Sequence, residues 1–195
     1  MRTDLEDLVR LAGWTPLQGP PRVGWDAAQR AAGIELPSDY REFVDVFGSG
    51  EFRGDLGVLD PLPGPGGPAG DDGVRRMLRR TTEDVGPRFR AMREDSFDLC
   101  PYPVYPEPGG LLLWGGNYNG DHCFWLTADD DPDRWPVVLW DRGRFPDAWS
   151  RYDMGMAEFL LLVLAGETPG LADLAYRKPG VPVWVPDTGR TGAGR

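Results

Sequence analysis

The chain has 195 residues, with 31 acidic side chains against 21 basic ones, which gives a formal net charge of −10. A surface with this charge repels nucleic acids and anionic membranes and suits a basic partner, besides keeping the protein in solution. Cys100 and Cys123 are the two cysteines of the chain, and their number and spacing exclude both a disulfide framework and a typical zinc site.

Residues 3–12 have the pattern of an amphipathic helix. Thr3 and Glu6 are spaced as a capping box, in which Thr3 is the predicted N-cap and Glu6 reaches back to it. Gly13 predicts the end of the helix. The apolar positions follow the spacing of one helical face and are Leu5, Leu8, Val9 and Ala12.

Two further helices are expected in the N-terminal part. The first spans residues 25–32 and ends at Gly33. The second begins at Pro37, whose fixed φ suits the first helical position, and ends at Gly48. The apolar face of this second helix is predicted from the same spacing and consists of Tyr40, Phe43, Val44 and Phe47.

The middle of the chain combines short strands with irregular and polar segments. Strands are expected over residues 51–53 and 56–59, on either side of a turn. A loop rich in proline and glycine follows over residues 61–73. Residues 74–93 are predicted to form a polar, arginine-rich helical stretch with a break near Gly86.

The C-terminal half is predicted to be a sheet that is closed by a helix. Short loops between the strands favour antiparallel pairing. The strands are expected over residues 111–114, 122–127, 135–140 and 149–152, with turns over residues 115–120 and 129–134. Residues 156–165 are apolar nearly all round and are expected to form a buried helix that ends at Gly166.

This order of elements indicates the α+β class, with N-terminal helices, a central mainly antiparallel sheet and a buried C-terminal helix. We expect a single domain over residues 1–170. Residues 171–195 are interpreted as a C-terminal extension, with a candidate strand over residues 181–185 and a polar, disordered tail from residue 188.

Neither a secretory signal nor a membrane-spanning segment is expected. Acidic residues stand at positions 4, 6 and 7, and no apolar core of a signal peptide follows them. The longest apolar run, residues 159–165, is shorter than a membrane span. We therefore expect a cytoplasmic protein with no membrane partner.

The densest group of charges is a run of aspartates near residue 130. Asp129, Asp131 and Asp133 match the first half of a calcium loop. The match then fails, because Arg134 stands where the turn glycine is needed and Trp140 where the bidentate glutamate is needed. We therefore predict no metal site. The run is either a solvated hairpin tip or a partner contact in which carboxylates imitate a phosphate backbone.

His122 is the one histidine of the chain and lies in a predicted strand beside Cys123. Neighbours in a strand point to opposite faces, so these two side chains are not expected to form a nucleophile–base pair. A hydrolase that uses His122 with Asp121 or Asp141 stays open as one class of function, as does a pairing of His122 with Cys100.

Several short motifs follow one another in a fixed order over residues 14–166. They are Leu36-Pro37-Ser38-Asp39-Tyr40, Gly48-Ser49-Gly50, Gly120-Asp121, Pro136-Val137-Val138 and Glu158-Phe159-Leu160. As an ordered set, they resemble the SUKH superfamily, which includes yeast cell-wall assembly regulators and many bacterial immunity proteins.

The resemblance implies an α+β fold that is not an enzyme and has no cofactor. Bacterial members look like immunity proteins that neutralise toxin domains, often nucleases, of polymorphic or contact-dependent systems. A cognate, basic, nuclease-like toxin domain is therefore the expected partner, and this chain is expected to be a monomer or a weak dimer. The alternative is an intracellular regulatory scaffold of the cell-wall regulator type, without a toxin. Because partner-binding residues vary within the superfamily, they are predicted from this sequence and are Asp129, Asp130, Asp131, Asp133, Asn117, Tyr118 and Asp121.

Overall fold

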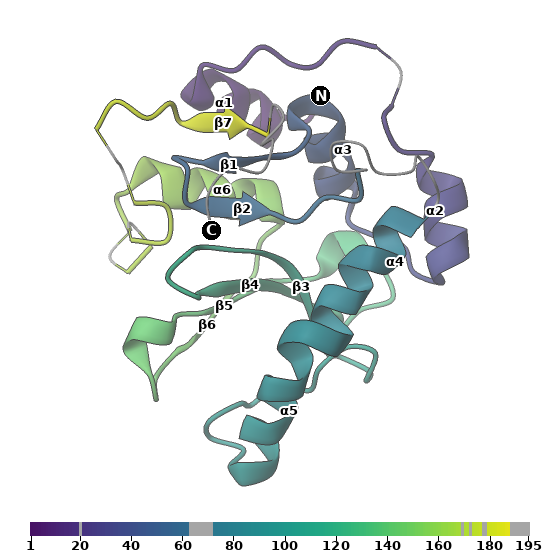
Figure 1. Cartoon of the computed structure of the whole chain (residues 1–195), viewed down its shortest axis with the longest axis vertical. Helices are drawn as coiled ribbons and strands as arrows, with labels where there is room; N and C mark the ends of the chain where they lie inside the picture. The colour runs from purple at the N-terminus through teal and green to yellow at the C-terminus, as the bar shows by residue number, and fades with distance from the viewer. Residues whose placement is uncertain (20, 63–71, 169, 172, 177–178, 188–195) are drawn as a thin grey trace, which may run out of the picture.

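The computed structural model describes residues 1–19, 21–62, 72–168, 170–171, 173–176 and 179–187. The helices are α1 (Thr3–Ala12), α2 (Trp25–Ala32), α3 (Ser38–Phe47), α4 (Asp72–Arg79), α5 (Gly86–Asp95) and α6 (Met156–Ala165), with a π-helical segment η1 (Arg80–Val85) and 3-10 turns η2 (Pro132–Arg134) and η3 (Arg142–Arg144). The strands are β1 (Gly50–Phe52), β2 (Leu56–Val58), β3 (Leu111–Gly116), β4 (His122–Leu126), β5 (Val137–Trp140), β6 (Trp149–Tyr152) and β7 (Trp184–Pro186) (Figure 1).

Within the described residues, seven strands form one sheet in the order β6-β5-β4-β3-β2-β1-β7. Each neighbouring pair of strands is antiparallel. N-terminal helices, an antiparallel sheet and a C-terminal helix confirm the predicted α+β class. No helix in the described part of the chain is long and apolar enough to cross a membrane.

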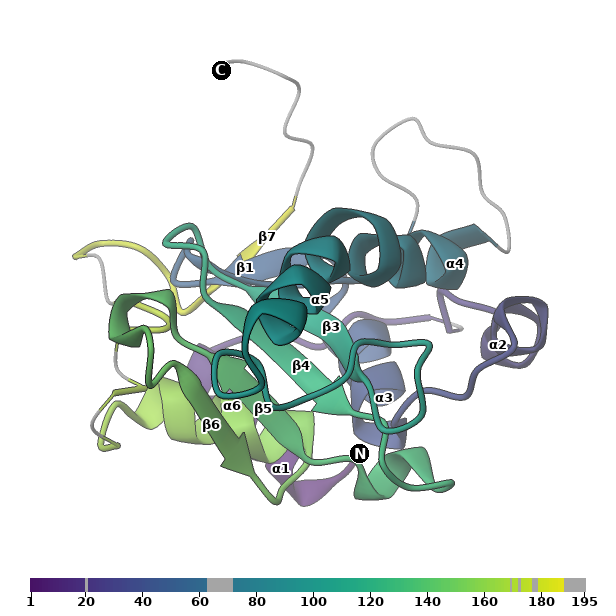
Figure 2. The same ribbon diagram turned by 90° about the horizontal axis from the view of Figure 1, so that it is seen from below.

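The central strands are buried on both faces because alternate side chains enter two separate cores. In β4, Cys123 and Trp125 belong to the main core, which also contains the buried faces of α1, α3 and α6. Phe124 belongs to the second core and contacts Phe89 of α5. Figure 2 shows α4 and α5 over one face of the sheet and α1 and α6 over the other. This double burial explains why the strands are nearly continuous apolar runs.

The predicted capping box of the first helix is wrong. Helix α1 begins at Thr3 itself, and its N-cap is Arg2, which makes no side-chain capping hydrogen bond. Helix α3 begins at Ser38, one residue after the predicted start. The carboxylate of Asp133 accepts hydrogen bonds from the backbone N–H of Ser38 at 2.5 Å and from its hydroxyl at 2.8 Å. The cap of α3 therefore comes from a loop 95 residues away in the sequence.

The helical stretch in the middle of the chain does not break near Gly86. Helix α4 continues through η1 into α5, which begins at that residue. In η1, Thr81 is fully buried, and its hydroxyl accepts a hydrogen bond of 3.0 Å from the backbone N–H of Leu113. The register of β3 shifts between Leu113 and Gly115. Thr81 thus supplies an acceptor at an irregularity of the sheet, where ladder pairing is interrupted.

Replacing Thr81 with valine is expected to lower the free energy of unfolding by about 1–2 kcal/mol, because the N–H of Leu113 loses its acceptor in a dry environment. Urea denaturation measures the change. The matched control is Thr82→Val, since the Thr82 hydroxyl bonds back to the carbonyl of Leu78 within the same helix. The control should change stability by less than about 0.5 kcal/mol. Equal losses in the two variants would contradict the role given to Thr81.

The candidate strand of the C-terminal extension is present as β7, somewhat later than predicted. It pairs with β1, and Trp184, which is 3% exposed, belongs to the main core. Residues 184–186 of the predicted extension therefore complete the sheet of the domain. The predicted tail from residue 188 lies outside the described residues, and so do residues 63–71 of the loop predicted over residues 61–73. The last two residues of that predicted loop, 72 and 73, belong to α4.

Candidate functional site

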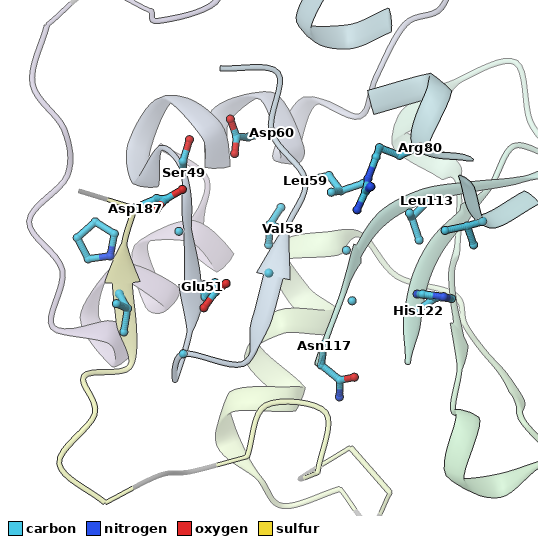
Figure 3. A pocket seen from close by; sticks show the side chains of 18 of the residues that line it. Ser49, Glu51, Val58, Leu59, Asp60, Arg80, Leu113, Asn117, His122 and Asp187 are labelled. Atoms are coloured by element: carbon cyan, nitrogen blue, oxygen red, sulfur yellow. The ribbon is translucent and has the colours of Figure 1, made fainter. Parts of the chain in front are cut away.

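An open groove of about 600 Å³ crosses β1, β2 and β3 on the face of the sheet that carries α4 and α5. This volume lies within the range of ~300–1,000 Å³ that is usual for binding sites. Figure 3 shows polar side chains from several elements around the groove. Those that the argument uses are Glu51, Asp60 and Asp187 together with Arg80, Asn117 and His122.

The floor of the groove follows from the register of the sheet. One cross-strand row passes from Glu51 in β1 through Gly57 in β2 and Gly116 in β3 to His122 in β4. Val185 of β7 extends this row beyond Glu51. Neighbouring strands are ~4.8 Å apart, so two glycines leave a gap of roughly 14 Å between the strand positions of Glu51 and His122. The groove follows this row and is open over Gly57, whereas over Gly116 it is narrowed by the carbonyl oxygen of Asp121 and the ring of His122, which lie 2.6 and 3.2 Å from the place of a Cβ there.

The two glycines of the floor are required to different degrees. A Cβ at Gly116 would lie 2.6 Å from the carbonyl oxygen of Asp121, so this close approach of the backbone requires glycine. A Cβ at Gly57 would meet nothing closer than the carbonyl oxygen of Gly116 at 3.8 Å and a side-chain carbon of Glu51 at 3.9 Å. The φ of Gly57 is also outside the left-handed region. Glycine weakens a strand interior, and neither sterics nor backbone conformation demands it at position 57.

Asp60 lies two residues after the end of β2 and lines the groove. Burial raises the pKa of Asp60, and the negative charge of Asp187 adds to this effect. Hydrogen bonds from the backbone of Leu62 and the side chain of Ser49 lower the pKa, as does the charge of Arg76, but they do not outweigh burial. Asp60 and Asp187 thus both line the groove, and the charge of Asp187 makes ionisation of Asp60 less favourable.

The opposite side of the groove carries less positive charge than its residue types suggest. Arg80 forms an ion pair of 2.9 Å with Asp84 on its own helix. His122 stacks on Trp140 with ring centroids 5.7 Å apart. Burial, followed by the charge of Arg88, lowers the pKa of His122 to about 4, so the imidazole is neutral at pH 7. Among the described lining residues, the groove is therefore acidic at neutral pH.

Three aspartates of the predicted partner-binding run stabilise their own surroundings. Asp129 pairs with Arg134, which lowers the pKa of the carboxyl group. Asp131 caps η2 by accepting a hydrogen bond of 3.0 Å from the backbone N–H of Asp133, and Asp133 caps α3. Asp130 is exposed, and its side chain has no hydrogen bond or ion pair within the described residues. A partner contact at this run stays a prediction.

The other predicted site residues form the turn between β3 and β4. The side-chain oxygen of Asn117 accepts hydrogen bonds from the backbone N–H groups of Asn119 at 3.1 Å and Asp121 at 3.0 Å. The buried carboxylate of Asp121 accepts from the Asn117 amide at 2.8 Å and from the backbone N–H of Arg142 at 2.8 Å. Tyr118 is 63% exposed, and its hydroxyl donates to Glu51 at 2.5 Å. Asn117 alone among these three predicted residues lines the groove.

The residues of the hydrolase alternative lie in different surroundings in the described part of the chain. His122 lines the groove, whereas Asp121 and Asp141 line a separate pocket that does not include the histidine. Cys123 lies in the main core, whereas the ring of His122 stacks on Trp140 of the second core, so these two side chains point to opposite faces as predicted. Cys100 belongs to the second core. Burial raises the pKa of both thiols. Neither cysteine is therefore placed or ionised as a nucleophile.

Among the described residues, no group of three or more histidine, cysteine, aspartate or glutamate side chains is arranged to hold a metal ion. Comparisons of the chain with models of protein families, with curated proteins and with solved structures find no match. Geometry and charge are thus the basis for assigning a role to the groove.

Proposed function

We propose that this chain is an immunity protein, which binds a cognate toxin domain of a bacterial polymorphic or contact-dependent system and neutralises it. The protein acts stoichiometrically in the cytoplasm, by covering the active cleft of the toxin or blocking the path of its substrate, and no bond is made or broken. The partner is a basic domain of the nuclease type.

The acidic groove is the observation that carries this proposal. It is open, it lies on the sheet, and its described lining has three carboxylates against the single guanidinium of Arg80, which already pairs with Asp84. An open acidic surface suits a basic protein surface better than it suits a reaction that needs an enclosed site.

The charge of the whole chain favours the same partner. A net charge of −10 attracts a basic domain over long distances and accelerates encounter, and this attraction weakens as salt is added. A nuclease that binds phosphate backbones has a basic cleft, so an acidic inhibitor competes with its substrate by charge.

Co-expression with the toxin domain encoded by the adjacent gene tests this function. We expect the host to survive when both chains are made and to die when the toxin domain is made alone, with a 1:1 complex on gel filtration. Death in both cases, or survival without a complex, would refute immunity for that pair. Capture of a housekeeping protein in place of a toxin would favour the regulatory scaffold.

A further inference from the structure

We propose that the gap over Gly57 and Gly116 is a receptor for one arginine side chain of the partner protein. The guanidinium lies against the acidic side of the groove, which is formed by Glu51, Asp60 and Asp187. The assignment of the arginine to a partner protein rests on the proposed function. The receptor site itself is argued from the groove.

The shape of the groove suits a long, flat side chain. The cross-strand row is open over Gly57, where a Cβ would meet nothing closer than 3.8 Å, and the glycine backbone at this part of the floor permits close approach. Glu51 on one side and the neutral ring of His122 on the other bound this part of the groove, and Val185 adds an apolar surface beyond Glu51. An arginine buries its aliphatic stem along such walls and presents its planar head to carboxylates.

The charges around the groove favour a cation over an anion. Asp60 and Asp187 both line the groove, and a guanidinium near them would offset the effect of the Asp187 charge on Asp60. Arg80 pairs with Asp84, and the guanidinium of Arg76, whose charge also acts on Asp60, donates to the backbone carbonyl of Leu62 at 3.0 Å. The described lining thus has three carboxylates and one guanidinium.

Gly57 supplies an independent argument. Strand β2 would be more stable with a β-branched residue at this position, and the structure has room for its Cβ. Glycine at position 57 weakens the strand, although neither sterics nor backbone conformation requires it. Its presence is explained if a ligand needs an open floor at this position.

The test uses the full chain and two blocked tripeptides, acetyl-Gly-Arg-Gly-amide and acetyl-Gly-Glu-Gly-amide, in NMR titrations of the ¹⁵N-labelled protein. We expect the arginine peptide to cause saturable shifts of the amide signals of Gly57, Gly116 and Asn117. The glutamate peptide should bind at least about tenfold more weakly, because it meets like charge. Absence of saturable shifts, or equal shifts with the two peptides, would overturn the receptor site.

Gly57→Val is the decisive variant, because its side chain fills the gap. We expect it to abolish the shifts caused by the arginine peptide while unfolding stability stays equal or rises. The matched control is Ser150→Val, which places the same side chain in edge strand β6 outside the groove and should leave the shifts intact. Asp187→Asn, at an exposed position, provides a second variant that removes charge without filling space, and it should weaken the arginine peptide several-fold.

The outcomes separate this inference from the proposed function. The peptide titration needs no toxin, so it decides whether the groove accepts a guanidinium. If the chain rescues the host from a toxin but Gly57→Val rescues equally well, the protein is an immunity protein and the groove is not its receptor. If the arginine peptide binds but no toxin is neutralised, the receptor site stands and immunity fails.

Discussion

Replacing Trp184 with alanine is expected to lower the free energy of unfolding by about 3–5 kcal/mol. The indole is 3% exposed and packs among the rings of Phe43, Phe47 and Phe52, with centroid distances of 5.8, 5.2 and 4.8 Å. Its removal leaves a cavity in the main core and deprives these rings of their contacts at the β7 edge of the sheet. Urea denaturation followed by tryptophan fluorescence measures the loss.

The matched control is Tyr176→Ala, which removes an aromatic ring from the same C-terminal region at a position that is 56% exposed. It should change stability by less than about 0.5 kcal/mol. A small loss for Trp184→Ala would mean that residues 184–186 are a peripheral appendage. A large loss makes them a part of the folding unit, although they lie beyond the boundary predicted at residue 170.

Helices and strands with strong local signals could be predicted from the sequence. The helix over residues 25–32 and the buried helix over residues 156–165 have the predicted bounds, because a glycine specifies the end of each and the uniformly apolar character of residues 156–165 marks that segment. The starts of α1 and α3 were harder to place. The cap of α3 is a long-range contact from Asp133, which no local pattern contains.

The groove could not be predicted in the same way. Its floor depends on which residues stand opposite one another in β1, β2, β3 and β4, and this register is a property of the assembled sheet. The one local signal was Gly57, between the apolar residues Leu56 and Val58 of a predicted strand. The aspartate run attracted attention by its charge density, yet its members Asp129, Asp131 and Asp133 are tied to the loop and to α3.

Replacing Asp39 with alanine is expected to lower the free energy of unfolding by about 2–3 kcal/mol. Asp39 in α3 is 3% exposed, and its carboxylate accepts a hydrogen bond of 3.0 Å from the backbone N–H of Ala157 in the first turn of α6. Alanine leaves that buried N–H without an acceptor and removes the contact that joins the two helices. Asp39→Asn is the matched control, because an amide oxygen can still accept this hydrogen bond, and it should lose less than the alanine variant.

The pH dependence of Asp39→Asn gives the prediction a second readout. Burial raises the pKa of Asp39 above its ordinary value of 3.8, despite the hydrogen bonds from Ala157 and Tyr40. The folded state thus binds this proton more tightly than the unfolded state, so the contribution of Asp39 to stability is complete below pH 3.8 and declines as the pH rises through the folded pKa. The stability of the wild type relative to Asp39→Asn should therefore fall as the pH rises from 3.8 through the raised folded-state pKa. A difference that grows with pH would mean that the carboxylate is stabilised in its charged form, and the joint between α3 and α6 would then be an ionic cap rather than a buried acceptor.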